Sequence, residues 1–222
     1  MRKIPFTTGE FYHVYNRGVE KRNIFQNKDD LARFFQSIQQ FNTRNPIGSI
    51  YENSFRKEKT LGHEVSKLVN FVCYSTSLNH YHFILEQLAD KGVEKFMHRL
   101  GNGYTKYFNH KYKRSGVLFQ GVFQSKHISS NEYLLHLSVY INLNNRIHGR
   151  NCNILSGLGH EVSKSSWEEY TNDCEIELCH NKNVILGQFK NKKEYKEFAE
   201  KFVKGIVERK EDLKKLENYI IE

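Results

Sequence analysis

The sequence predicts an α+β fold, a sandwich in which helices pack against a mainly antiparallel sheet. Short alternating, aromatic segments typical of strands are interleaved with segments whose apolar residues recur at helical spacing. Their order along the chain is strand, helix, strand, strand, helix, strand, helix, which indicates this class of fold. With 222 residues, of which 38% are hydrophobic and 27% charged, the chain is long enough to bury one sizeable core.

The first part of the chain alternates between the two patterns. Residues 11–16 alternate and are aromatic, which predicts a strand, and residues 29–41 place apolar side chains at helical spacing, which predicts a helix. Residues 43–67 contain proline, glycine and many charges, and we expect a loop insertion there. Residues 68–75 and 80–87 are strand-like and are expected to pair with each other.

Two helices and an extended segment follow. Residues 92–112 form a basic, aromatic amphipathic segment, which predicts a helix, and residues 117–128 favour an extended conformation. Residues 129–144 give the best-marked helix, because Ser129 and Glu132 have the spacing of an N-terminal capping box.

The chain becomes polar after residue 149, and we therefore predict a domain over residues 1–150 and a C-terminal extension over residues 151–222. The extension contains an amphipathic helix over residues 192–219, whose lysines and glutamates are expected to face solvent. The heptapeptide Leu-Gly-His-Glu-Val-Ser-Lys occurs twice, at residues 61–67 and 158–164. Both copies lie in predicted loops, and their histidines are not expected to bind metal.

The charge predicts a polyanionic partner. The formal net charge is +9 and the isoelectric point is near 9.2, which favours nucleic acid. A membrane is not favoured, because no basic amphipathic segment lies beside an apolar anchor and no run of 18 apolar residues occurs. The N-terminal residues lack the apolar core of a signal peptide, so a cytoplasmic location is expected.

Two histidines mark the most informative segment, the strand-like residues 80–87. Residues two apart on a strand point to the same side, so His80 and His82 converge while Tyr81, Phe83 and Leu85 face a core. Two imidazoles on a rigid strand form half of a divalent-metal site. Eleven histidines in the chain would produce roughly 0.5 such pairs by chance, so two ordinary strand histidines are the alternative.

A polar stripe marks the helix predicted over residues 129–144. His136, Tyr140 and Asn144 stand four residues apart and therefore share one side of it. A tyrosine in such a stripe is a candidate nucleophile, and an ordinary packed tyrosine is the alternative, because the chain contains 13 tyrosines.

Several co-ordered motifs resemble the REP-associated tyrosine transposases, which belong to the IS200-like, HUH single-strand transposase superfamily. The resemblance covers roughly residues 8–150, with a weaker echo at residues 165–167 and 184–189. The motifs are Tyr12-His13-Val14-Tyr15-Asn16-Arg17-Gly18, His80-Tyr81-His82, Gly116-Val117-Leu118-Phe119-Gln120-Gly121, and Tyr133-Leu134-Leu135 followed by Tyr140-Ile141-Asn142-Leu143-Asn144. The chain departs from the family at Asn145, where proline is usual, at Phe119, often tryptophan, and at Val122, often basic.

The resemblance implies a ferredoxin-like sandwich, with a central antiparallel sheet and helices on its faces, followed here by a C-terminal helical extension. It implies an HUH endonuclease in which His80, His82 and Asn144 hold a divalent metal ion, Mg²⁺ or Mn²⁺, and Tyr140 is the nucleophile. The implied substrate is single-stranded DNA with a hairpin formed by a palindromic repeat. The resemblance also favours a monomer over a homodimer.

Attack by a tyrosine assisted by a divalent ion is chemically reasonable. A tyrosine hydroxyl with a pKa near ~10 is a poor nucleophile at neutral pH, and a divalent ion would offset the charge that develops on the phosphate. Attack by Tyr140 would leave a 5′-phosphotyrosine and a free 3′-hydroxyl, so strands could be rejoined without ATP. Tyr133 is the reserve nucleophile, Glu86 a competing metal ligand, and His136 a candidate proton carrier.

Basic side chains interleaved with aromatic ones are typical of single-strand binding. The expected DNA contacts are Arg17, Arg22, Arg99, Lys106, Arg114, Phe119, Gln120 and Lys126. We therefore predict metal-dependent, tyrosine-mediated cleavage and rejoining of single-stranded DNA. A hairpin DNA- or RNA-binding module without cleavage is the first alternative. The second is a structural zinc protein that uses Cys152, Cys174, Cys179 and His180.

Overall fold

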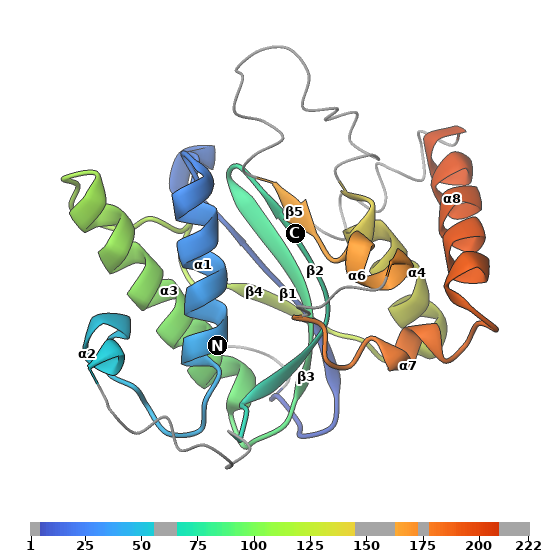
Figure 1. Cartoon of the computed structure of the whole chain (residues 1–222), viewed down its shortest axis with the longest axis horizontal. Helices are drawn as coiled ribbons and strands as arrows, with labels where there is room; N and C mark the ends of the chain where they lie inside the picture. Colours follow the sequence, from blue (N-terminus) through green and yellow to red (C-terminus); the bar gives the residue numbers. More distant parts are fainter. Residues whose placement is uncertain (1–4, 56–65, 145–162, 173–177, 209–222) are drawn as a thin grey trace.

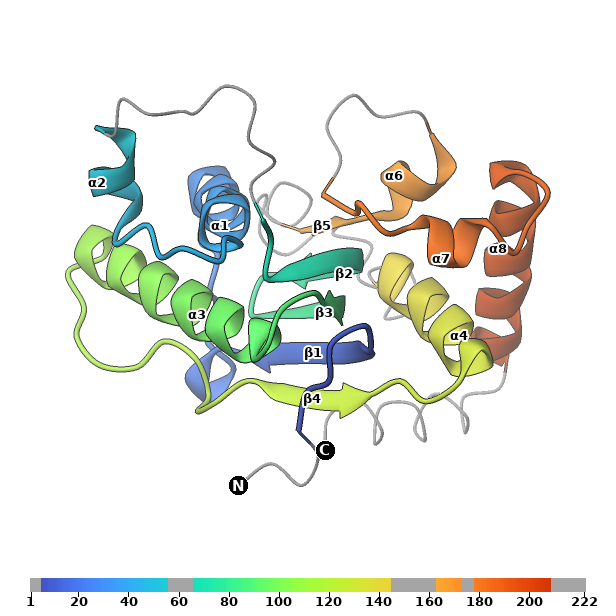
Figure 2. The ribbon, with the colours of Figure 1, turned by 90° about the horizontal axis from the view of Figure 1, so that it is seen from below.

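The computed structural model describes residues 5–55, 66–144, 163–172 and 178–208 (Figure 1). Five strands form one antiparallel sheet in the order β4-β1-β3-β2-β5, and Figure 2 shows the first four of them side by side. The strands are β1 (Phe11–Arg17), β2 (Val69–Ser77), β3 (His80–Gln87), β4 (Gln124–His127) and β5 (Lys164–Ser165).

The connection of these strands confirms the predicted fold class. Helix α1 (Lys28–Phe41) joins β1 to β2, and helix α3 (Gly92–Lys111) joins β3 to β4. Strand, helix, strand, strand, helix, strand with β1 and β3 at the centre is the split βαβ arrangement of ferredoxin-like folds. The predicted strand over residues 80–87 coincides with β3.

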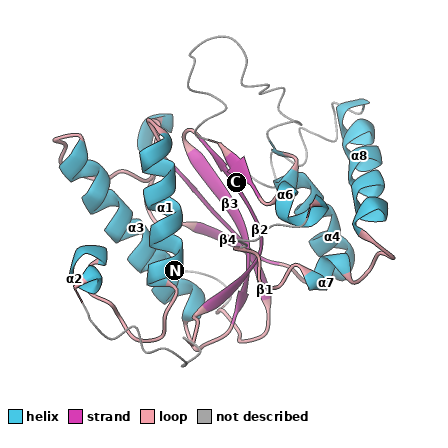
Figure 3. Ribbon diagram, in the orientation of Figure 1, coloured by secondary structure: helices cyan, strands magenta, loops and turns pink. Residues whose placement is uncertain are grey.

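Helices cover both faces of the sheet (Figure 3). Helices α1 and α3 bury an aromatic core against one face, to which β3 contributes Tyr81, Phe83 and Leu85. Helix α4 (Asn131–Asn142) packs on the other face, where Ile84 joins a second core. Three C-terminal helices complete that second core: α6 (Trp167–Thr171), α7 (Asn183–Leu186) and α8 (Lys192–Glu208). Among the described helices, none combines the length and apolar character needed to cross a bilayer.

Three predicted boundaries need correction. The capping residue of α4 is Ser130, whose side chain accepts the Tyr133 N–H; Ser129 is not the cap. Within residues 117–128, only Gln124–His127 is a strand, and the residues before it form a loop bridged to Gly18 at Phe119. The expected loop over residues 43–67 contains a short helix, α2 (Ile50–Ser54), with its own capping box. The predicted helix over residues 192–219 is described as far as Glu208.

A fully buried carboxylate ties α1 to α3. Asp30 Oδ1 accepts hydrogen bonds from Lys111 Nζ at 2.7 Å and Tyr107 Oη at 3.1 Å, and Oδ2 accepts from Tyr112 Oη at 2.7 Å and Gln26 N at 2.8 Å. Burial disfavours the charged carboxylate, but these bonds and the Lys111 charge outweigh it and hold the Asp30 pKa below its ordinary 3.8.

The substitution Asp30→Asn is expected to lower the free energy of unfolding by about 1–3 kcal/mol, because an amide cannot accept four donors. The exposed neighbour Asp29, in the same helical turn, is the control, and Asp29→Asn should change stability by less than about 1 kcal/mol. Because the folded pKa of Asp30 is lowered, its contribution is present above pH 3.8 and disappears as pH falls through the folded pKa. Urea denaturation across this range checks both effects; equal losses in the two variants would contradict the assignment.

Candidate active site

The strand register gathers the histidines on the α4 side of the sheet. His80 and His82 share this side of β3, opposite to the side that carries the aromatic core. Tyr15 of β1 and Ser75 of β2 lie directly across from His82, and Arg17 lies directly across from His80. Directly paired side chains point to the same face. We call this the histidine face: the α4 side of the sheet, carrying His13, Tyr15, Ser75, His80 and His82.

The His80 ring is held through Nδ1, which lies 2.6 Å from Asn79 Oδ1. The Asn79 amide is oriented by its other end, because Nδ2 donates to the Lys21 carbonyl at 3.1 Å. Asn79 therefore presents an oxygen to His80, which places the His80 proton on Nδ1 and the lone pair on Nε2.

His13 is a further residue of the histidine face, and its sequence motif alone does not mark it as a site residue. Its Nε2 lies 3.1 Å from His82 Nδ1, and its side chain is completely buried. Burial, followed by the charge of Lys126 on the neighbouring strand, lowers the pKa of His13 to about 3, so the ring is neutral. Alternation along β1 places His13 beside Tyr15, but only the pairing of β1 with β3 brings it to His82.

The C-terminal end of α4 lies beside the same row of residues. Ser75, which pairs with His82, pairs on its other side with Ser165 of β5. Ser165 Oγ then donates to the main-chain carbonyl of Asn142 at 2.9 Å. The helix that carries Tyr140 is thus tied to the edge of the sheet at the level of the His82 row. Tyr140 itself packs in the second core and is 2% exposed.

A buried polar cluster fixes this end of α4. The Asn142 cluster comprises Asn142, Ser165, Ser166 and Tyr195. Asn142 Nδ2 donates to Tyr195 Oη of α8 at 2.9 Å, and Asn142 Oδ1 accepts from Ser166 Oγ. Ser166 Oγ also accepts the Tyr74 N–H at 2.9 Å. Since Asn142 lies two residues from both Tyr140 and Asn144, the cluster sets their positions on the helix end.

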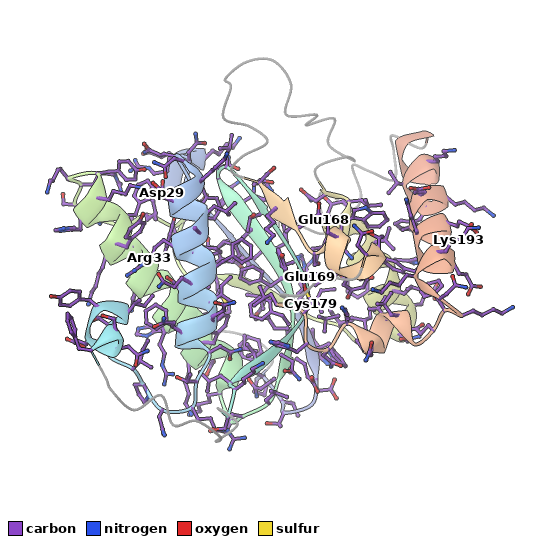
Figure 4. All side chains as sticks on the ribbon, in the orientation of Figure 1. Asp29, Arg33, Glu168, Glu169, Cys179 and Lys193 are labelled. Carbon is purple, nitrogen blue, oxygen red and sulfur yellow. The ribbon has the colours of Figure 1, made fainter. Side chains whose placement is uncertain are left out.

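In the described part of the chain, buried polar atoms without hydrogen-bond partners concentrate at the histidine face and the end of α4. Among the described residues, four buried side-chain polar atoms have no hydrogen-bond partner: His13 Nδ1, Ser75 Oγ, Asn144 Oδ1 and Arg33 Nε. The first two belong to the histidine face and the third to the end of α4. Only Arg33 lies elsewhere, on α1 across the sheet (Figure 4). Buried polar atoms are normally satisfied, so such a concentration indicates a site for water, an ion or a ligand.

These residues fit a divalent ion by their chemistry. His80 and His82 present two imidazoles with ring centroids 5.2 Å apart, and Asn144 adds an amide oxygen that lacks a protein partner. The amide oxygen suits Mg²⁺ and Mn²⁺, whereas imidazole nitrogens are typical ligands of transition-metal ions such as Zn²⁺ and Fe²⁺. Within the described part of the chain, no group of three or more His, Cys, Asp or Glu residues could hold a metal. The candidate third ligand is the Asn144 amide oxygen.

The competing candidates are engaged elsewhere. Glu86 Oε2 accepts from Asn70 Nδ2 at 3.0 Å and from Asn181 Nδ2 at 2.8 Å. Glu86 pairs with Phe11, four residues along β3 from the pair of Tyr15 and His82. The His136 ring stacks on Phe202 of α8, with centroids 4.8 Å apart. The shared stripe of His136 and Tyr140 therefore does not bring this histidine to the site.

Tyr133, the reserve nucleophile, lies near the histidine face. Burial raises the pKa of Tyr15, and the neighbouring Tyr133 raises it further.

The alternative of a structural zinc site can be examined only in part, because Cys152 and Cys174 lie outside the described residues. Burial, and then Glu169 and Cys73, raise the pKa of Cys179 well above its usual 9.0, which disfavours the thiolate that zinc requires. Figure 4 shows Glu169 and Cys179 next to each other.

Three predicted DNA contacts lie around the histidine face. Arg17 pairs with His80, and its Nε donates to Gln120 Oε1, which joins the end of β1 to the loop before β4. Lys126 of β4 pairs directly with His13.

Four other predicted contacts lie farther from this face. Arg22 is half-buried and lies 3.5 Å from Glu20. Arg99, Lys106 and Arg114 lie on or just after α3, on the opposite side of the sheet; Arg99 donates to the main-chain carbonyl of Thr43 and Arg114 to Asn109 Oδ1. Their role in DNA binding stays a prediction.

Phe119 requires a correction. Its ring is predicted from the sequence to contact DNA, but the side chain is 7% exposed and packs edge-on against Tyr81, with centroids 5.8 Å apart. The bridge to Gly18 turns this side chain into the aromatic core. The exposed apolar side chains of the same loop are Val117 and Val122.

Comparison with known proteins gives one distant structural likeness. No protein-family model matches this chain, and no curated protein matches it. Among solved structures, that of a REP-associated tyrosine transposase bound to a REP hairpin aligns with a TM-score of 0.42 and 11% sequence identity, covering 67% of this chain and 73% of that chain.

Two serines of the site provide a matched test. Ser75→Ala removes a hydroxyl that has no partner among the described residues, so the variant should be as stable as the wild type or slightly more stable. Ser166→Ala leaves the Tyr74 N–H and the Asn142 amide oxygen without their hydrogen-bond partner. It should therefore lower the free energy of unfolding by about 1–3 kcal/mol. Urea denaturation in the presence of EDTA measures both. A loss at Ser75 as large as that at Ser166 would show that the Ser75 hydroxyl is already paired.

Proposed function

We propose that this protein cleaves and rejoins single-stranded DNA at a hairpin through a covalent phosphotyrosine, as a transposase-like strand transferase. One observation carries the proposal: the histidine face and the end of α4 meet in a region that holds three of the four unpaired buried polar atoms described. The order of the sequence motifs, which resembles that of REP-associated tyrosine transposases, supports it.

His80, His82 and Asn144 would hold a divalent ion, Mn²⁺ or Mg²⁺. When bound, such an ion polarises the scissile phosphate and offsets the negative charge that develops on its oxygens. The protein's own part is to orient the ligands. Asn79 holds the His80 ring, and the Asn142 cluster holds the turn that carries Asn144.

Tyr140 is the nucleophile in this proposal. Its Oη attacks the phosphorus in line with the 3′ oxygen; an O–P bond forms to the tyrosine, the bond from phosphorus to the 3′ oxygen breaks, and its electron pair goes to that oxygen. Tyr140 loses one proton and the 3′ oxygen gains one, so the step balances. Reversal by a different 3′-hydroxyl rejoins the strands without an added energy source.

Charges around the histidine face supply the contacts to DNA. Arg17, held by Gln120 beside His80, and Lys126, across from His13, are placed to neutralise phosphates near the cleavage point. The hairpin nature of the substrate rests on the resemblance of the motifs.

The protein is proposed to act as a monomer. The Asn142 cluster and the second core hold α4 against the sheet of its own chain, so a partner's helix is not needed to complete the site. Sedimentation should therefore show a monomer whose specific adduct-forming activity does not depend on protein concentration. A dimer whose activity is lost on dilution would contradict this.

The burial of Tyr140 favours a second candidate function, a hairpin-binding module without cleavage. The residue is 2% exposed, so DNA binding would have to uncover its side chain before attack. A protein that only binds hairpins would need no such movement.

The deciding experiment compares Tyr140→Phe with Tyr133→Phe on the same helix, using labelled hairpin DNA, Mn²⁺ and a denaturing gel. We expect a covalent protein–DNA band in the wild type and in Tyr133→Phe, and none in Tyr140→Phe, because phenylalanine lacks the nucleophile. EDTA should abolish the band in the wild type and in Tyr133→Phe.

An adduct that survives in Tyr140→Phe would overturn the nucleophile. If the wild type binds the hairpin tightly but forms no adduct with Mn²⁺ or Mg²⁺, the protein is a hairpin-binding module without cleavage activity.

A further inference from the structure

We propose that His13 is a positioning residue: its Nε2 accepts the Nδ1–H of His82 and so reserves the lone pair of His82 Nε2 for the divalent ion. This inference rests on the proposed function, because it assigns His13 a role toward a ligand of the same site.

The geometry of the two rings is that of an edge-to-edge contact. Nε2 of His13 and Nδ1 of His82 are 3.1 Å apart, their ring planes differ by 19°, and the ring centroids are 5.3 Å apart. Near-coplanar rings meeting through one pair of nitrogens direct the N–H of one toward the lone pair of the other. Tyr15 lies alongside both, with its ring centroid 4.9 Å from that of His13 and 5.6 Å from that of His82, and limits their rotation.

Only one proton sits between the two nitrogens, which leaves two arrangements. If His13 donates, the proton of neutral His82 is on Nε2, and that nitrogen cannot bind an ion. If His82 donates from Nδ1, its Nε2 carries a lone pair and can bind one. A working site with His82 as a ligand therefore requires His13 to be the acceptor.

His80 has the same arrangement. Asn79 Oδ1, fixed as an acceptor because Asn79 Nδ2 donates to the Lys21 carbonyl, takes the proton on Nδ1 of His80. His13 stands in the same relation to His82. Each strand histidine thus has a neighbour at Nδ1, which is the usual way in which proteins orient metal-binding imidazoles.

Stability alone does not account for a histidine at position 13. When His13 accepts at Nε2, its own proton is on Nδ1, a completely buried atom without a partner among the described residues. A leucine would carry no unpaired nitrogen of its own but would leave His82 Nδ1 without its partner. The imidazole therefore gives no net gain in paired buried nitrogens, and its distinct effect is to fix the proton of His82.

The test measures Mn²⁺ affinity of the full chain by calorimetry, for the wild type, His13→Leu and His13→Gln. Leucine cannot accept a hydrogen bond, and we expect Mn²⁺ affinity to fall roughly 10- to 100-fold. Glutamine can present its amide oxygen near the position of Nε2, and its affinity should stay within about 10-fold of the wild type. The control is His136→Leu, in a histidine stacked on α8, which should leave Mn²⁺ affinity unchanged.

A second measurement keeps the test independent of how well His13→Leu folds. In Mg²⁺-loaded wild type, long-range ¹⁵N–¹H correlation should place the His82 proton on Nδ1. A proton on Nε2 would overturn the inference. So would unchanged Mn²⁺ affinity in folded His13→Leu, or a glutamine variant as weak as the leucine variant.

Failure here is distinguishable from failure of the proposed function, which the covalent adduct of Tyr140 reports. A wild type that forms the adduct, with Mn²⁺ affinity indifferent to His13, removes only the role of His13. A wild type that binds no Mn²⁺ overturns the role of His13, and the adduct gel then decides the function separately.

Discussion

The alternation of side chains along β3 is the constraint on which the rest of the structure depends. This central strand buries Tyr81, Phe83 and Leu85 against α1 and α3, and the same period of two turns His82 and Ile84 to the α4 side. A slip of one residue would put the histidines into the aromatic core and the aromatic rings on the opposite face, so the register is strongly specified. The position of the histidines is thus set by the packing of their neighbours, which is why a polar pair can be held so rigidly.

Local pattern predicted the main strands and helices but not the contacts between them. The strand over residues 80–87 and the helix over residues 92–112 follow from periodicity within a single segment, and the structure confirms both almost to the residue. The meeting of His13 with His82 depends on the pairing of two strands 69 positions apart in the chain, about which neither segment carries information. Phe119 shows the same limit, because a bridge to Gly18 decides whether its ring faces solvent or the core.

The helix end that carries Tyr140 shows how the later part of the chain contributes to the site. Residues 163–172 and 178–208 supply strand β5 to the same sheet and helices α6, α7 and α8 to the second core. The Asn142 cluster draws on β5, the start of α6 and α8 at once, and every polar atom of the Asn142 side chain has a partner in it. A fully satisfied buried network of this kind specifies one arrangement of its elements, since any shift leaves an amide or a hydroxyl unpaired. Tyr140 and Asn144, two residues to either side, are placed by that network although they take no part in it.

On the α4 side of the sheet, hydrogen-bonded polar groups and unpaired polar groups therefore occur in different places. In the Asn142 cluster the side-chain polar atoms are paired and stabilise the fold, while His13, Ser75 and Asn144 each bury an atom that no described residue satisfies. Unpaired buried atoms lower stability, and substitution by apolar side chains of similar shape would remove that penalty. Their gathering beside two strand histidines, instead of being scattered through the core, is what a site that needs a bound ion or water would produce. The unpaired atoms lower the stability of the fold at a place where a bound ligand could pair with them. The Asn142 cluster compensates by holding the backbone of α4 in place.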